Sequence, residues 1–305
     1  MTEVLTLVLQ QSINGITLGC LYVLVALGLT LIYGVMNQIN FAHADFVTAG
    51  AFIAFFVATR FATKVLGLPD AAGYIFSILA AFALGALLGL AVNAAVFAPL
   101  RERGDELRPL VATIGVSVLL ENGQLALFGP IPFQFDSPFA QHTIRFGKIF
   151  FTEQSVVVVV VAAVAIAALY AFMRFTFLGK ALRAVSQDRE TAGLMGINQN
   201  FLIALTIVIA SALAGMAGAL LGPVIVLTPF AGTSVIVKAF AIVIIGGFGN
   251  MGGTIIAGIL VGLIEAFTVQ LLGPGLIDLI VFVLLLVMLV VKPTGLIAER
   301  REENV

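Results

Sequence analysis

Long stretches without a charged residue constrain this chain more than any other feature of its sequence. The 25 positions from Tyr74 to Ala98 carry no charge, and neither do the 17 from Val156 to Phe172. A helix needs about 20 apolar residues to cross the hydrocarbon core of a bilayer. The ten-residue segments of alternating hydrophobicity that are typical of membrane barrels are absent from the sequence. The sequence therefore predicts an all-α polytopic membrane protein.

The composition agrees with this class and excludes several others. Of the 305 residues 61% are hydrophobic and 10% are charged, whereas soluble domains average about 25% charged residues. A net charge of −1 argues against nucleic-acid binding through a broad basic surface. With two histidines and one cysteine, neither a metal site of the usual spacing nor an internal disulfide is expected. No nucleophile elbow or Walker motif appears, so we predict no catalytic, cofactor-binding or metal-binding residue and expect a chain that is not an enzyme.

Apolar segments divide residues 1–305 into a single membrane domain. The seventh segment is short and ends in the glycine-rich run 246–253, so it is either a full span or a broken, re-entrant element. We therefore expect eight or nine transmembrane helices. The segments lie at about 10–33, 41–60, 73–98, 109–128, 153–173, 200–222, 235–250, 253–272 and 276–291.

The basic residues of the loops predict an orientation for this domain. With nine crossings, most of them fall on one side: Arg101, Arg103, Arg108, Arg174, Lys180, Arg183, Arg189, Lys292, Arg300 and Arg301. Cytoplasmic loops carry an excess of Lys and Arg, so the C-terminus is expected in the cytoplasm and the N-terminus outside. With eight crossings the seventh segment would have to fold back. The 129–152 loop, external in this orientation, is expected to be either a docking surface for an external partner or an ordered cap.

The 174–199 loop contains a helix-prone part at 182–195. A short amphipathic helix held outside the membrane can lie in the headgroup layer or fill a groove on a soluble partner. The sequence Gly196-Ile197-Asn198 is expected to stop this helix before the next span begins. Its expected apolar stripe consists of Leu182, Val185, Ala192 and Met195.

Three positions of this loop resemble a known coupling element. Glu190-x-Ala192-x-x-x-Gly196 is similar to the Glu-Ala-Ala-x-x-x-Gly motif of ABC importer permeases, with Thr191 in place of the middle alanine. In those permeases the helix that carries the motif sits in a cleft of the ATP-hydrolysing subunit. The resemblance favours the second use of the helix, docking on a soluble partner.

Four further elements resemble the LivH-type permeases of branched-chain amino acid ABC transporters. Residues 39–45, Ile-Asn-Phe-Ala-His-Ala-Asp, are similar to the family signature Ile-Asn-Phe-Ala-His-Gly-Glu. The run 179–197 resembles the coupling loop of the same family, and 238–253 resembles its Lys-Ala-Phe…Gly-Gly-x-Gly-Ser-x-x-Gly element. Residues 292–296, Lys-Pro-Thr-Gly-Leu, are similar to its C-terminal motif. The resemblance covers essentially the whole chain, and its departures, Ala44, Asp45 and Asn250, leave the substrate open.

The resemblance implies one of two permease subunits of an importer in the bacterial inner membrane. Its implied partners are a LivM-type permease, two cytoplasmic ATPase subunits that bind the ATP, and a periplasmic solute-binding protein. Branched-chain amino acids are the expected cargo. The residues implied in ATPase coupling are Arg183, Asp188, Glu190, Ala192 and Gly196. The candidate path or gate residues are Asn40, His43, Asp45, Lys238, Gly246, Gly247, Gly249 and Asn250.

Each candidate path residue also has a structural interpretation. Asp45 can stabilise a helix N-terminus behind Asn40, its candidate N-cap, and on a helix it points about 200° away from His43. Lys238 is expected near the outer end of its span, where a long side chain can reach the interface. Glu121 and Glu265, which are followed by apolar runs, are expected to face the bundle interior and form hydrogen bonds. Glycine pairs such as 218/222 and 258/262 are expected at close helix contacts.

Two other functions stay open on the sequence alone. Near relatives of the LivH-type permeases carry urea or short-chain amides, and a stand-alone secondary transporter or channel is possible. The absence of a paired intramembrane proton relay and the presence of a coupling-type helix argue against the stand-alone carrier. A further hypothesis is that 40–43 and 246–253 are matching helix interruptions that flank a transport path.

Overall fold

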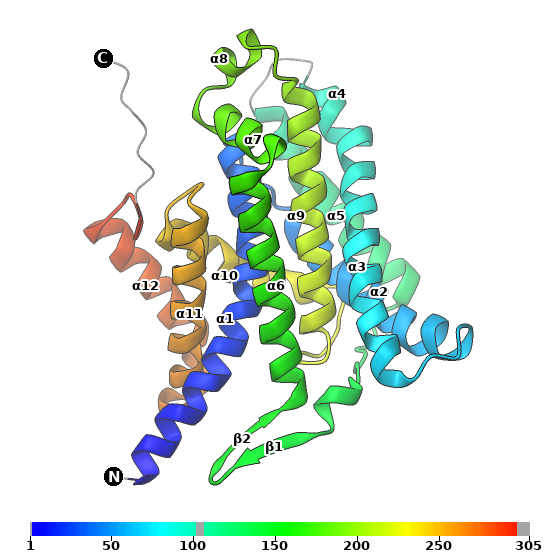
Figure 1. Ribbon diagram of the computed structural model, residues 1–305, viewed down its shortest axis with the longest axis vertical. Helices are drawn as coiled ribbons and strands as arrows, with labels where there is room; N and C mark the ends of the chain where they lie inside the picture. Colours follow the sequence, from blue (N-terminus) through cyan, green and yellow to red (C-terminus); the bar gives the residue numbers. More distant parts are fainter. Residues whose placement is uncertain (1, 102–106, 298–305) are drawn as a thin grey trace.

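The computed structural model describes residues 2–101 and 107–297 as a bundle of helices (Figure 1). Within these residues eight helices, some of them continuing from one element into the next, are long and apolar enough to cross a membrane. They are formed by α1 (Thr2–Met36), α2 (His43–Phe56) with η1 (Val57–Ala62), α3 (Asp70–Val92) with η2 (Asn93–Phe97) and α4 (Ala98–Arg101), α5 (Leu107–Phe128), α6 (Glu153–Phe175), α9 (Gln199–Leu221), α11 (Met251–Leu272), and η4 (Pro274–Leu276) with α12 (Ile277–Val291). The expected all-α polytopic fold is confirmed. Of the basic residues that predicted the orientation, Arg103, Arg300 and Arg301 lie outside the described part.

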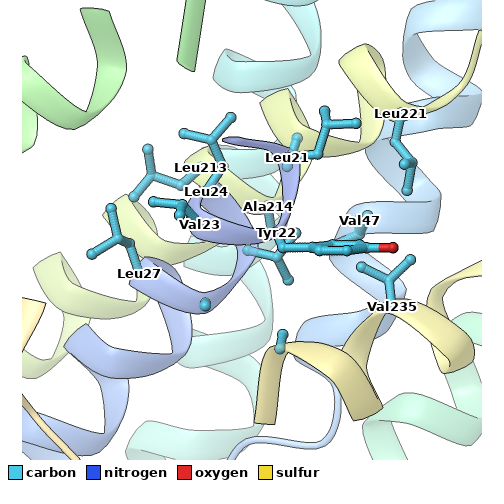
Figure 2. Close-up of a cluster of buried hydrophobic side chains, with 14 of the residues drawn as sticks. Leu21, Tyr22, Val23, Leu24, Leu27, Val47, Leu213, Ala214, Leu221 and Val235 are labelled. Carbon is cyan, nitrogen blue, oxygen red and sulfur yellow. The ribbon is translucent and has the colours of Figure 1, made fainter. Parts of the chain in front are cut away.

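Helix α1 is the centre of the bundle. Its positions 19–32 are all buried, and 89% of its most apolar stretch lies inside the protein, compared with 6% for α12. Figure 2 shows Leu21, Tyr22 and Leu24 of α1 among side chains of α2, α9 and α10. The exposed face of α12 is as apolar as the core, because lipid and not water surrounds such a helix.

Glycines let the central helices approach each other closely. A Cβ on Gly218 of α9 would overlap the carbonyl oxygen of Val47 on α2, and one on Gly262 of α11 would overlap the backbone of Gly15 and Gly19 on α1. The close packing expected for the glycine pairs is confirmed at these contacts.

The seventh span is broken, and the break precedes its helix. After α9 the chain passes through 222–230, and α10 (Ala231–Gly246) follows with only 16 residues. Pro223 and Pro229 lie in the connecting segment, where they lack the N–H groups that a continuous helix would need. The glycine run 246–253 does interrupt the helix, since 247–250 form the tight turn between α10 and α11 (Met251–Leu272), with Gly247 at φ 103° and Gly249 at φ 78°. It does not shorten the seventh span from within; the irregular segment before α10 does.

Helices α2 and α10 both begin about halfway across the bundle. The His43 ring, at the start of α2, lies against Gly28 of α1. The carbonyl oxygen of Ala210 lies beside the same glycine, and Ala210 is the midpoint of α9. A Cβ on Gly232, at the start of α10, would overlap the carbonyl oxygen of Ala44 on α2. Helix α10 therefore adds one shorter apolar helix to the eight long helices of the described residues, and the segment before it is irregular.

The two ends of the bundle carry different caps (Figure 1). At one end, called the hairpin end, strands β1 (Thr143–Phe146) and β2 (Ile149–Thr152) pair antiparallel next to η3 (Pro138–Ala140) and the start of α1. At the other, called the coupling-loop end, lie α7 (Phe177–Gln187) and α8 (Arg189–Leu194). The α10–α11 turn and the segment after α12 meet at the coupling-loop end, where Leu296 N donates to Ile245 O at 2.7 Å. Helices α1 and α12 therefore place the two ends of the described chain at opposite ends of the bundle.

The 129–152 loop is an ordered cap over the hairpin end. The Gln10 side-chain amide donates to Phe150 O at 2.7 Å and accepts from Phe150 N at 3.0 Å, which fixes β2 on α1. Buried Gln154 accepts from Ser137 at 2.8 Å and donates to the Tyr74 hydroxyl at 2.7 Å. The alternative use of this loop, as a docking surface, stays a prediction.

Candidate functional site

The coupling loop contains two helices where the sequence predicted one. Asp188 interrupts the helix at φ −149° and caps α8, with its carboxylate accepting from Thr191 N at 3.1 Å. An aspartate competes for backbone N–H groups in this way and favours helix starts over helix interiors. The hydrogen bonds from the Thr191 hydroxyl and N–H hold the pKa of Asp188 below its usual value. The stop at Gly196 is confirmed, with Gly196 at φ 82°. Asn198, which follows, caps α9 by accepting from Phe201 N at 3.0 Å.

The apolar stripe of the loop faces the bundle, with one exception. Leu182, Val185 and Ala192 are buried in one cluster with the end of α1 and the start of α9. Met195 is 80% exposed, as is its neighbour Leu194 at 89%. The expected place of Met195 on the stripe is therefore wrong, because the break at Asp188 turns α8 relative to α7. An apolar tip is left exposed at the far end of the loop.

Arg189 fastens the loop to the bundle, a role that the sequence interpretation missed. Its guanidinium donates from Nε to Val35 O at 2.9 Å and from Nη2 to the same oxygen, at the C-terminal end of α1. The Gln199 side chain donates to Arg189 O at 2.7 Å and so joins α8 to the start of α9. Of the predicted coupling residues, Arg183, Asp188, Glu190 and Gly196 are exposed and Ala192 is buried. Movement of this loop would therefore be transmitted to α1 and α9.

Lys238 lies in a buried cluster near the middle of the bundle. Its Nζ is 2.8 Å from Glu265 Oε1 on α11 and 3.2 Å from the Tyr22 hydroxyl on α1, which donates to Glu265 Oε2 at 2.8 Å. The Lys238 and Glu265 side chains are only 13% and 8% exposed. The prediction that Lys238 lies near the outer end of its span and reaches the interface is wrong. Helix α10 starts halfway across the bundle, so this lysine lies in the interior. Glu265 faces the interior and is hydrogen-bonded, as expected.

The start of α2 connects to two other helices. His43 Nε2 is 3.1 Å from Val25 O on α1, whereas Asp45 Oδ2 accepts from the Ser117 hydroxyl on α5 at 2.5 Å. The two side chains point to different neighbours, as their spacing predicted. Asn40 is not the N-cap of α2; Ala42 holds that position, and Asn40 Oδ1 accepts from Ala42 N at 3.1 Å, in the turn before the helix.

The predicted path residues fall into separate groups. Gly246, Gly247, Gly249 and Asn250 belong to the α10–α11 turn at the coupling-loop end, and Asn250 Oδ1 caps α11 by accepting from Gly253 N at 2.8 Å. His43 and Asp45 belong to the first turn of α2, where the carbonyl oxygen of Ala44 lies against Gly232 at the start of α10, and Asn40 lies in the turn before that helix. The structure therefore does not pair 40–43 with 246–253. It pairs the start of α2 with the start of α10.

A mixed polar and apolar face covers the start of α10. Phe230, Thr233, Ser234 and Val237 are exposed at helical spacing, although they lie within the depth of the bundle. The exposed ring of Phe41 lies 5.7 Å from that of Phe240 along the same face. Phe230, the N-cap residue of α10, makes no side-chain capping bond, and backbone carbonyls serve the first turn instead: Ala231 N donates to Thr228 O at 3.0 Å and Thr233 N donates to Phe230 O at 3.2 Å. Any N–H group of a helix start that is left without a partner costs several kcal/mol when it faces hydrocarbon.

Comparison with known proteins identifies the family. The family model for the branched-chain amino acid transport system permease component matches residues 11–291. The chain belongs to this family. It is a transport subunit and a multi-pass protein of the inner membrane. The resemblance read from its motifs is confirmed.

Several relatives match the permease over its full length. It is 34% identical over 316 residues to the high-affinity branched-chain amino acid transport system permease protein LivH of Escherichia coli, covering 100% of both chains. It is 34% identical to the corresponding protein BraD of Pseudomonas aeruginosa, over 97% of this chain and 98% of that one. A probable LivH of Methanocaldococcus jannaschii is 28% identical over 90% of the permease and 88% of its own length. Among solved structures, PsaBC from Streptococcus pneumoniae in complex with Fab aligns with a TM-score of 0.46 at 15% identity, over 93% of this chain and 91% of that one.

Proposed function

We propose that this chain is the permease subunit of an ABC importer that carries branched-chain amino acids. The observation that carries the proposal is the full-length identity to relatives named for high-affinity transport of these amino acids. The proposed complex adds a LivM-type permease, two ATPase subunits that bind the ATP, and a periplasmic binding protein. In this complex the C-terminus and the coupling loop face the cytoplasm, in agreement with the basic residues at that end.

The cargo path lies, in this proposal, along the face where α2 and α10 begin. A helix start at this depth without a side-chain cap favours water or protein against it, which a path shared with the second permease would supply. The partial positive charge of the two helix starts suits the α-carboxylate of an amino acid, and the Asp45 carboxylate suits its ammonium group. Exposed Phe41, Phe230 and Val237 offer apolar contacts to a branched side chain.

The coupling loop receives the ATPase movement in the same proposal. The exposed tip of Leu194 and Met195, beside Glu190, is the part that would fit a cleft of the ATPase subunit. The tether from Arg189 to Val35 would pass the displacement to α1, which contacts both α10 and α11. The path and the loop are then joined through the central helix.

Reconstituted transport tests the proposal. Proteoliposomes that hold the four kinds of subunit should take up labelled leucine only with ATP, and labelled urea at background rates. The variant Glu190→Lys with Gly196→Asp should abolish uptake while it leaves the purified permease folded. Uptake by the permease alone without ATP would overturn the importer and make the chain a stand-alone carrier. Uptake of urea in preference to leucine would overturn the cargo.

A further inference from the structure

A cavity of about 430 Å³ opens at the coupling-loop end. Its walls come from the last turns of α1 and α6, from α7, and from the α10–α11 turn. It therefore touches both the coupling loop and the helices that hold the central Lys238–Glu265 pair. The polar side chains that line it include Tyr170, Arg174, Arg183, Ser186 and Asn250.

The charge in this cavity is all of one sign. Two guanidinium groups, those of Arg174 and Arg183, line it, and none of the described residues around it is acidic. Arg174 donates to the Tyr170 hydroxyl at 2.7 Å and lies 5.9 Å from the centre of the same ring, which fixes its position on the wall. The N-terminus of α11, at Asn250 and Met251, also borders the cavity and adds partial positive charge. An anion is the ligand that such a site favours.

The depth of the cavity indicates which anion. Arg174 lies in the last turn of α6, and the rings that follow it, Phe175 and Phe177, are 73% and 81% exposed. Exposed aromatic and basic side chains at the end of a transmembrane helix mark the boundary between hydrocarbon and headgroups. Lipid phosphates lie at this level, and basic pockets between transmembrane helices bind anionic headgroups.

We propose that this cavity binds the phosphate group of an anionic phospholipid. The two guanidinium groups match phosphate oxygens with paired N–H donors, which a lysine pair would not do equally well. The Ser186 hydroxyl and the Asn250 amide are further polar groups for the headgroup alcohol. The acyl chains would lie against the apolar outer faces of the bundle. Arg183, which the family resemblance implied in ATPase coupling, faces the cavity and would act there through the lipid.

Lipid binding to the purified full-length chain tests this site. Native mass spectrometry should detect bound phosphatidylglycerol on the wild type after detergent exchange. The double variant Arg174→Gln with Arg183→Gln should bind it about tenfold or more weakly, because each arginine near a headgroup contributes about 1 kcal/mol. The control Lys180→Gln with Lys148→Gln removes the same charge outside the cavity and should bind as the wild type does. Equal retention by the cavity variant and the control would overturn the proposal.

Two further variants test whether weaker binding comes from misfolding, and a competition with inorganic phosphate distinguishes a lipid headgroup from a free anion. Ser186→Glu puts a carboxylate on the cavity wall and should weaken phosphatidylglycerol binding without any loss of an arginine. Arg174→Lys with Arg183→Lys keeps the charge and should bind more tightly than the glutamine pair. Inorganic phosphate at millimolar concentration should leave the lipid adduct in place. Displacement of the lipid by phosphate at that concentration would make this a site for free anions and overturn the lipid proposal.

Discussion

The central cluster and the coupling loop carry charge in opposite ways. In the cluster, Glu265 and Tyr22 are buried, Lys238 is largely buried, and the three groups satisfy one another within 3.2 Å. In the loop, Arg183, Asp188 and Glu190 are exposed, and the buried side chains are small and apolar. A buried charge keeps its place only while its partner is present, whereas an exposed charge is solvated in any case. Substitutions in the cluster should therefore act on the fold, and substitutions in the loop should act on communication with the partner.

The largest expected effect comes from breaking the central pair. Lys238→Met leaves the Glu265 carboxylate buried without its cation, which should destabilise the fold by about 3–5 kcal/mol. Thermal unfolding of the detergent-solubilised permease measures this loss. Lys148→Met on the exposed hairpin is the matched control and should unfold at the wild-type temperature.

The double variant Lys238→Met with Glu265→Leu sharpens the same test. With both charges gone no unpaired ion remains, so the double variant should recover most of the stability that the single variant loses. A single variant as stable as the wild type would mean that the pair does not hold α10 against α11, and the comparison between cluster and loop would fail.

A smaller effect is expected from the tether between loop and bundle. Arg189→Ala removes the guanidinium from Val35 O, and hydrogen bonds that involve a charged group contribute about 1.5–3 kcal/mol. The loss should be local, because α7 remains packed through Leu182 and Val185. Hydrogen–deuterium exchange should therefore increase in 189–199 and stay unchanged in the part of α1 that precedes Val35 in the sequence.

The control for the tether is Arg183→Ala, on the neighbouring helix and exposed. It should leave exchange in 189–199 at the wild-type rate, since Arg189 and not Arg183 donates to Val35 O. Equal exchange in both variants would show that Arg189 does not hold α8 in place.

The sequence identified the loop better than the cluster, for a physical reason. Loop charge, the stop at Gly196 and the motif at 190–196 are local patterns, and each depends on residues within a few positions of one another. The break at Asp188 was also readable, because aspartate is a favoured N-cap residue and Glu190 follows it in the first turn of α8. The family signature located the start of α2, although not its depth.

The contacts of the cluster could not be predicted from local patterns. Lys238 and Glu265 are 27 positions apart and Tyr22 is 216 positions from Lys238. Their meeting depends on where α10 begins, and that depends on the irregular segment 222–230, whose prolines were not weighed. Because the start of α10 was misplaced, Lys238 was predicted at the wrong depth. For the same reason the start of α2 was paired with the glycine run 246–253 and not with the start of α10. One misplaced helix start accounts for all of these differences.

Asp188 provides a test of the loop by pH. Its folded-state pKa lies below the usual value, so the cap stabilises α8 above the unfolded-state pKa and is lost as pH falls through the folded-state pKa. Between pH 5 and 8 the carboxylate stays ionised, and exchange in 189–194 should show no step in its pH dependence beyond the intrinsic one. Asp188→Ala should raise exchange there at every pH, whereas Asp188→Asn should keep the cap. A titration step near neutral pH in the wild type would contradict the assignment.

The smallest effect on the fold is expected at the exposed tip. Leu194→Ser with Met195→Ser changes two side chains that are 89% and 80% exposed, so the free energy of unfolding should change by no more than an ordinary surface substitution changes it, about ±0.5 kcal/mol. If the tip enters a cleft of the ATPase subunit, the same variant should weaken the complex, as measured by co-purification of the ATPase. The control Val290→Ser with Val291→Ser, at 83% and 75% exposure on α12, alters an equally apolar pair that does not belong to the loop. Loss of the ATPase in both variants would point to a general effect of surface polarity. Retention of the ATPase in both would show that the tip is not part of the interface, and the loop would then contact the ATPase through its charged residues alone.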